Sequence, residues 1–115
     1  MPTEIIAITT EDLNGLKSQV SRNFGKSPYY VVVKMRNGEP RTVDSRKNHY
    51  FNGHQMGLIP CTHDIGINVV LTGRMEPRIV EMFDDLGIRV ITDLEGDAGE
   101  ALQNYILDHD KGDRA

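Results

Sequence analysis

The strongest structural signal in the chain is the run Tyr29-Tyr30-Val31-Val32-Val33-Lys34-Met35, followed at once by Arg36-Asn37-Gly38. Its β-branched and aromatic residues predict a strand. Asn-Gly is the preferred pair for a two-residue hairpin turn, so the chain should return over about Glu39 to Ser45. This returning segment is mostly polar and contains Pro40, which cannot donate to a sheet ladder. We therefore predict that it forms an edge strand.

Apolar runs on either side of this hairpin predict three more strands, at Ile5–Ile8, Ile67–Leu71 and Ile88–Ile91. Helices are predicted over about 58–65 and 76–86, the second with a core stripe of Ile79, Met82, Phe83 and Leu86. A last helix should begin at the capping pair Asp97 and Glu100. A hairpin followed by strand–helix–strand–helix indicates an α/β fold with a mixed sheet and helices on its faces.

The totals place the chain in a broad class. Its 115 residues fit one domain, which we expect over 1–108, with a disordered polar tail over 109–115. The net charge of −4 disfavours nucleic acid as a partner. A lone cysteine, Cys61, permits no internal disulfide, and no apolar run is long enough for a signal peptide or membrane span. We expect a soluble, cytoplasmic protein that does not bind membranes.

The loop from Thr10 to Pro28 is the first segment that could carry function, because long loops in compact domains are usually functional. Its centre offers cations at Arg22 and Lys26, an apolar anchor at Phe24 and a permissive backbone at Gly25; the hydrogen-bonding side chains are Ser21, Asn23 and Ser27. The alternative is that Phe24 pins the loop to the core while its polar residues face water.

The segment Thr72-Gly73-Arg74 is the second candidate, since it lies between a buried strand and a helix. A helix N-terminus attracts anions, and Arg74 would reinforce that attraction. The alternative is an ordinary strand-to-helix turn in which Gly73 serves geometry and Arg74 is solvated.

Soft metal ligands form the third candidate set: His49, His54, Cys61 and His63. They lack the spacing of a closed zinc site, although an open cluster site with one or two protein donors fits them. The alternatives are a buried, unreactive Cys61 and histidines at the surface. Nucleotide-binding loops and a nucleophile elbow are absent from the sequence, so no enzyme active site is predicted.

Together these residues resemble a known family. The pattern Val20-Ser21-Arg22-Asn23-Phe24-Gly25-Lys26-Ser27-Pro28-Tyr29-Tyr30 is similar to the loop signature of the dinitrogenase iron-molybdenum cofactor biosynthesis family. The run from Val69 to Arg74 looks like that family's strand and Gly-Arg turn. The spacing onward to Phe83, Gly87 and Val90 also fits, and the resemblance covers about Ile5 to Leu107.

The resemblance implies a ribonuclease H-like α/β fold with a five-stranded mixed sheet and three helices. Nuclease chemistry on such a fold needs carboxylates on neighbouring central strands, which the strands at 5–8 and 67–71 lack. The resemblance further implies an iron–molybdenum–sulfur or molybdenum–copper–sulfur cluster as ligand. Protein purified in the apo form would carry no cofactor. The sequence departs from the family around Gly53-His54 and Pro60-Cys61, where a smoother, glycine- and alanine-rich helix start is usual.

The leading hypothesis is a monomeric, non-enzymatic carrier or assembly factor for an anionic metal–sulfur cluster. In this hypothesis the groove is formed by Ser21, Arg22, Phe24, Gly25, Lys26, Gly53, His54, Gly73 and Arg74. Backbone N–H groups and the cations would offset the cluster's charge, and His54 would donate to a metal, with His49, Cys61 or His63 as lesser candidates. Its partners would be cofactor-assembly or acceptor proteins. The alternatives are a cofactor-free interaction or regulatory module and a small-molecule enzyme.

Overall fold

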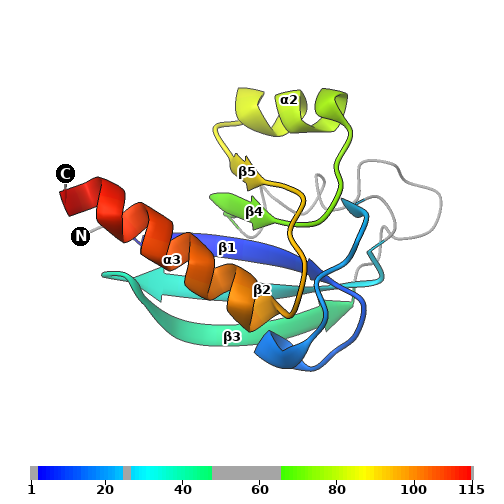
Figure 1. The fold of residues 1–115 in the computed structure, drawn as a ribbon, viewed down its shortest axis with the longest axis horizontal. Coiled ribbons are helices and arrows are strands. Elements are labelled where there is room, and N and C mark those ends of the chain that lie inside the picture. The colour runs from blue at the N-terminus through cyan, green and yellow to red at the C-terminus, as the bar shows by residue number, and fades with distance from the viewer. Residues whose placement is uncertain (1–2, 25–26, 48–65, 115) are drawn as a thin grey trace.

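The computed structural model describes residues 3–24, 27–47 and 66–114, with side chains described through Leu107. The described residues form five strands, two α-helices and one short 3₁₀ helix. They are β1 (Thr3–Thr10), the short 3₁₀ helix η1 (Gly15–Lys17), β2 (Tyr29–Arg36), β3 (Glu39–Lys47), β4 (Val69–Leu71), α2 (Pro77–Asp85), β5 (Arg89–Ile91) and α3 (Ala98–Arg114) (Figure 1).

The strands form one five-stranded sheet in the order β3-β2-β1-β4-β5. β1 pairs antiparallel with β2 and parallel with β4, and β4 pairs parallel with β5. The α/β class, the mixed five-stranded sheet and the edge position of β3 are therefore confirmed. Two α-helices lie within the described residues, whereas the helix expected at 58–65 falls outside them.

The two faces of the sheet have separate cores. On one face α3 lies across the sheet, and its Ala98, Leu102 and Tyr105 pack on a cluster that includes Ile6 and Val31 (Figure 1). On the other face, Ile79 and Phe83 of α2 join Phe24, Ala7 and Val70. Alternating side chains of β1 serve both clusters, which explains why its sequence is a continuous apolar run.

The hairpin between β2 and β3 has the predicted turn. Asn37 has φ 56° and Gly38 has φ 79°, the two successive positive values that a type I′ turn requires. Pairing shifts register between Lys34 and Met35, where Met35 faces Pro40 across the hairpin. A proline without an N–H group at an edge strand explains this irregularity.

The predicted core stripe of α2 is wrong at its last member. Ile79 and Phe83 are buried and Met82 is half-buried, but Leu86 is 42% exposed. Leu86 is the C-cap residue, where the chain has left the helical path before turning at Gly87 with φ 77°. A position outside the helix no longer follows its periodicity, so the apolar side chain does not reach the sheet.

At the start of α3, Oδ1 of Asp97 accepts a hydrogen bond from the Glu100 N–H at 2.7 Å, as the capping pair predicts. The helix then continues to Arg114, so the backbone of 109–114 is helical where a disordered tail was predicted. No proline interrupts this segment. In the described part of the chain no helix has the length and apolar character to cross a membrane.

Candidate functional site

The loop after β1 is fixed to both neighbouring turns. Its residues Ser18 to Val20 pair with the start of α3: the Ala98 N–H donates to the Ser18 carbonyl at 2.8 Å, and the Val20 N–H donates to the Gly96 carbonyl at 2.9 Å. The Ser21 N–H then donates to the carbonyl of Thr9 at 2.9 Å. These hydrogen bonds attach the loop to the end of β1 and to the start of α3. The loop therefore has a defined place beside β4 (Figure 1).

The centre of the loop pairs with the turn that follows β4. The Gly73 N–H donates to the Ser21 carbonyl at 3.0 Å and the Arg74 N–H to the Arg22 carbonyl at 2.7 Å. In return the Phe24 N–H donates to the Arg74 carbonyl at 2.9 Å, and Asn23 and Arg74 form a parallel bridge. The two segments that carry the sequence motifs are therefore hydrogen-bonded neighbours.

Gly73 is required by this close approach. A Cβ atom placed on Gly73 would overlap the carbonyl oxygen of Ser21 and lie 2.6 Å from the carbonyl oxygen of Arg22. Both obstacles are backbone atoms, which cannot rotate away as a flexible side chain would. The role of Gly73 is therefore to let the two chains meet.

Within the loop, two of the predicted ligand-contacting residues have structural roles. The Ser21 hydroxyl donates to the Asn23 carbonyl at 3.0 Å and is buried. Phe24 is 1% exposed and meets Phe83 of α2 in a T-shaped contact with ring centroids 5.5 Å apart. The interpretation of Phe24 as an anchor of the loop is thus confirmed.

The turn after β5 is hydrogen-bonded to the turn after β4. The Asp93 N–H donates to the Gly73 carbonyl at 2.8 Å and the Leu94 N–H to the Thr72 carbonyl at 3.1 Å. Beneath these turns the hydroxyls of Thr9 and Thr72 are hydrogen-bonded at 2.6 Å in the buried interior. Three segments at the carboxyl ends of β1, β4 and β5 are joined side by side, where open α/β sheets bind their ligands.

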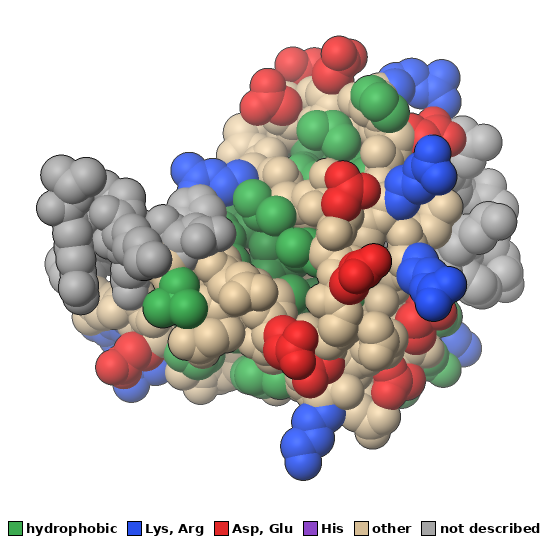
Figure 2. All heavy atoms as spheres, viewed as in Figure 1, with side chains coloured by type: hydrophobic (Ala, Val, Ile, Leu, Met, Phe, Trp, Pro, Cys, Tyr) green, Lys and Arg blue, Asp and Glu red, His purple; other side chains and the backbone are tan. Residues whose placement is uncertain are grey.

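These segments surround an open groove of about 640 Å³, lined by Gln19, Val20, Arg22, Gly73, Arg74, Asp93, Leu94 and Glu95. Arg22 and Arg74 are the exposed cations of this lining, and Asp93 and Glu95, on the turn after β5, are its exposed acids; we call the two pairs the arginine wall and the acidic wall. Figure 2 shows blue and red side chains close together at the right of the molecule, the side toward which the loop after β1 runs in Figure 1.

Among the predicted site residues, the structure brings together Ser21, Arg22, Phe24, Gly73 and Arg74. The other predicted residues, Gly25, Lys26, His49, Gly53, His54, Cys61 and His63, lie outside the described residues. Within residues 3–24, 27–47 and 66–107 no three His, Cys, Asp or Glu side chains are grouped for a metal ion. The described lining of the groove supplies charged side chains of both signs.

The helix predicted over about 76–86 begins as expected, just after the Thr72-Gly73-Arg74 segment. α2 begins at Pro77 with Glu76 as N-cap, so an acidic side chain and a residue without an N–H group stand at its start. The N–H groups of Gly73 and Arg74 are already bonded to the loop. Among the described side chains of the groove lining, the cations are the guanidinium groups of Arg22 and Arg74.

Sequence reasoning did not select the acidic wall. Asp93 lies two residues after the predicted strand Ile88–Ile91, so the rule that ligands bind at the carboxyl ends of parallel strands places it at the edge that carries the site, although its charge gave no reason to choose it for an anion. Its backbone is left-handed, with φ 63°, a conformation that Asp and Asn tolerate better than most residues.

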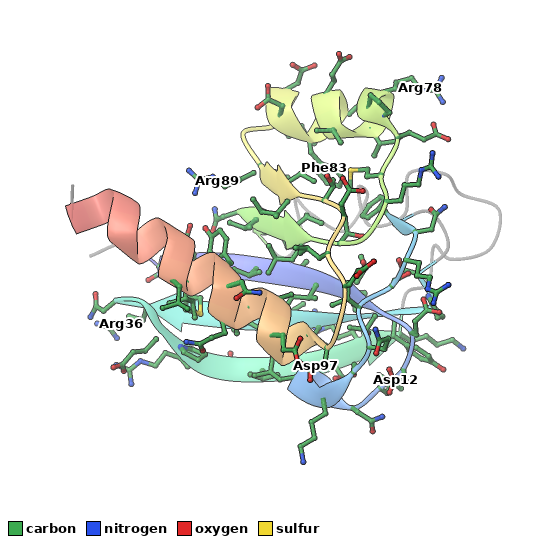
Figure 3. The ribbon with its side chains drawn as sticks, in the orientation of Figure 1. Asp12, Arg36, Arg78, Phe83, Arg89 and Asp97 are labelled. Carbon is green, nitrogen blue, oxygen red and sulfur yellow. The ribbon has the colours of Figure 1, made fainter. Side chains whose placement is uncertain are left out.

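A second hollow, of about 610 Å³, lies at the opposite ends of the parallel strands, between Glu4, Arg89 and the acidic face of α2. Beside it the Tyr105 hydroxyl donates to Oε2 of Glu4 at 3.0 Å. Burial, together with this hydrogen bond, raises the pKa of Tyr105 to about 12. In Figure 3 Arg89 stands at this end, well away from Asp12 and Asp97 on the loop side. The described lining of this hollow includes Val69, Gly87 and Val90 of the family pattern, but none of the predicted site residues.

Comparison with known proteins identifies the family of the chain. The family model described as dinitrogenase iron-molybdenum cofactor matches residues 4–108, and the chain belongs to that family. The protein PH0822 is 31% identical, with a TM-score of 0.79 and 90% of each chain covered. The apo form of the orange protein from Desulfovibrio gigas is 28% identical, with a TM-score of 0.74, 92% of this chain covered and 88% of that one.

A further solved structure shows how widely the fold extends. It is described as a putative NifB protein from Thermotoga and is 19% identical, with a TM-score of 0.71 over 89% of this chain and 86% of the other. At this identity the likeness shows the shared fold alone. No curated protein matches the chain.

Proposed function

We propose that the protein binds an anionic metal–sulfur cluster as cargo in the groove between Arg22, Arg74 and the turn after β5, and that it carries the cluster without catalysing a reaction. The cluster is of the iron–molybdenum–sulfur or molybdenum–copper–sulfur kind. Family membership supports the class of cargo, and the likeness to an orange protein described in its apo form supports a binding role. The fold is of the ribonuclease H-like kind.

The observation that carries the proposal is the pairing of Arg22 with Arg74 through their backbones. This pairing puts two exposed guanidinium groups on one wall of an open groove at the ligand-binding end of the sheet. Arginine suits a sulfide-rich anion because its several N–H donors are always charged and only weakly hydrated. The groove is open to solvent, which suits a cargo that has to leave again.

The rest of the site is proposed from the sequence. Gly25 and Lys26 follow Phe24 directly in the chain, so Lys26 is a third cation for the cargo. His54 is the proposed metal donor, with His49, Cys61 and His63 as further candidates and Gly53 beside His54 in the sequence. We also propose that the protein acts as a cytoplasmic monomer that passes the cluster to assembly or acceptor proteins.

Anaerobic loading tests this function. Apo-protein is incubated with tetrathiomolybdate, alone or with copper(I), or with iron and sulfide, and then desalted and analysed for retained metal and visible absorption. We expect retained metal in the native protein and at least a several-fold loss in Arg22→Gln/Arg74→Gln. Arg36→Gln/Arg41→Gln is the matched control, because it also removes two positive charges and both residues lie exposed near the far end of the sheet. Failure of the native protein to retain any of these metals overturns the proposal.

A further inference from the structure

The acidic wall of the groove is unexpected at a site for an anion. Asp93 and Glu95 line the same hollow as Arg22 and Arg74, so the described charged residues of the lining comprise two cations and two acids. In the described residues the ion pairs are Arg46 with Asp44 and Arg78 with Glu76. No ion pair within 4.0 Å neutralises the four groove residues against one another, although they share one hollow.

The position of Asp93 is fixed by its backbone. Its N–H group donates to the carbonyl of Gly73 at 2.8 Å, the residue directly before Arg74, and the next residue is held in the same way to Thr72. The left-handed φ of 63° at Asp93 turns the chain at this point. The backbone of Asp93 is therefore held in the same ladder of segments that presents the arginines, so its carboxylate is attached close to the arginine segment.

We propose that Asp93 and Glu95 set the affinity of the groove: their negative charges repel part of the cargo's charge and keep binding weak enough for release. This inference rests on the proposed function and assigns a role to residues for which the family match gives none. A highly charged anion is attracted to the arginine wall and repelled by the acidic wall, so its net affinity depends on both. Removal of an acid should tighten binding, and removal of an arginine should weaken it.

The magnitude follows from Coulomb's law. Deleting a unit charge that lies several ångströms from a divalent anion near a protein surface changes the binding constant of the anion by roughly threefold to tenfold at low salt. Screening shortens the reach of such a charge to roughly 4 Å at about 0.5 M salt, so the effect should nearly vanish there. A change that acted only through loop structure would persist at high salt.

The test measures anaerobic binding of tetrathiomolybdate, a dianion, by calorimetry. The variants are Asp93→Asn and Glu95→Gln, with Glu39→Gln on the far end of β3 as the control for an equal change in net charge. Asparagine accepts the left-handed backbone that Asp93 adopts, so Asp93→Asn should keep the fold. We expect binding at least about threefold tighter in Asp93→Asn and Glu95→Gln, and a less than about twofold change in Glu39→Gln.

Two outcomes separate this inference from the proposed function. If the native protein binds the dianion and the acid variants bind it equally or more weakly, the role of the acidic wall is wrong while cluster binding stands. If the native protein and all the variants fail to bind, both are wrong. Tighter binding that persists unchanged at high salt also contradicts an electrostatic role for these acids.

Discussion

The backbone N–H of Arg74 donates to the carbonyl oxygen of Arg22 at 2.7 Å, so two cations far apart in the sequence lie on adjacent segments of the chain. The neighbouring bond from the Gly73 N–H to the Ser21 carbonyl, 3.0 Å long, gives this contact a second anchor. The joint between loop and turn is thus made by backbone atoms. It positions the side chains of Arg22 and Arg74, but its hydrogen bonds do not involve them. Substitutions at Arg22 or Arg74 should therefore alter charge and leave the fold intact.

Gly73→Ala should disrupt this joint. The new methyl group would collide with the carbonyl oxygens of Ser21 and Arg22, and the expected cost is about 2 kcal/mol or more in the free energy of unfolding. Urea denaturation measures this cost. Gly87→Asn is the control, because Gly87 has a positive φ that Asn tolerates and an added Cβ would meet nothing within 4 Å. Equal stability of both variants would contradict the close approach.

Phe24 and Phe83 should be energetically coupled. Each is almost fully buried, so Phe24→Ala should cost about 3–5 kcal/mol. Their T-shaped contact should add a coupling energy of about 0.5–1.5 kcal/mol in a double-mutant cycle, best measured with Phe→Leu substitutions that keep the protein folded. Strictly additive effects would show that the loop is not anchored through this ring pair.

The hydroxyls of Thr9 and Thr72 should act as a pair. Either Thr→Val substitution leaves the other buried hydroxyl without its 2.6 Å partner, at an expected cost of about 1–3 kcal/mol. The double substitution removes both hydroxyls, so it should cost less than the sum of the two single changes. Thermal unfolding of the four proteins tests this, and a double variant that is as costly as the sum contradicts the pairing.

The raised pKa of Tyr105 predicts that the folded protein loses stability at alkaline pH. Its pKa is raised from 10.0 to about 12 in the folded protein, chiefly by burial and also by its hydrogen bond to Glu4. Between these two values the unfolded chain loses the proton first, so stability is full below about pH 10 and falls as pH rises to about 12. Allowing for partial hydration of the hydroxyl, the loss is about 1–2 kcal/mol.

Tyr105→Phe should remove this part of the alkaline loss, while costing about 1 kcal/mol at neutral pH through the lost hydrogen bond. The measurement is the free energy of unfolding in urea at pH 8 to 12 for both proteins. The substitution leaves every other titratable side chain in place, so the difference between the two curves isolates Tyr105. Parallel curves throughout this range would contradict the raised pKa.

Much of the fold could be predicted because its signals are local. The Asn37-Gly38 turn, the polar edge strand with Pro40 and the capping pair of Asp97 and Glu100 each depend on neighbouring residues. Phe24 could be recognised as an anchor because a lone aromatic residue in a polar loop has few other roles. Leu86 was misjudged since its periodicity continues past the point where the helix ends.

The site was less predictable because it depends on contacts between distant segments. Gly73 could be read as a turn residue, but nothing local reveals that the backbone of Ser21 and Arg22 lies against it. For the same reason, sequence alone suggested free N–H groups that the structure shows bonded to the loop. Asp93 and Glu95 join the groove through the order of the sheet, which fixes the neighbours of each strand end.

The most direct test of cluster binding in this groove is a two-dimensional amide NMR titration with tetrathiomolybdate under anaerobic conditions. The account predicts saturable shifts at the amides of Arg22, Gly73, Arg74 and Asp93, with Glu39 and Arg41 unchanged at the far end of the sheet. Absence of any shift, or shifts confined to the hollow beside Arg89, would contradict it.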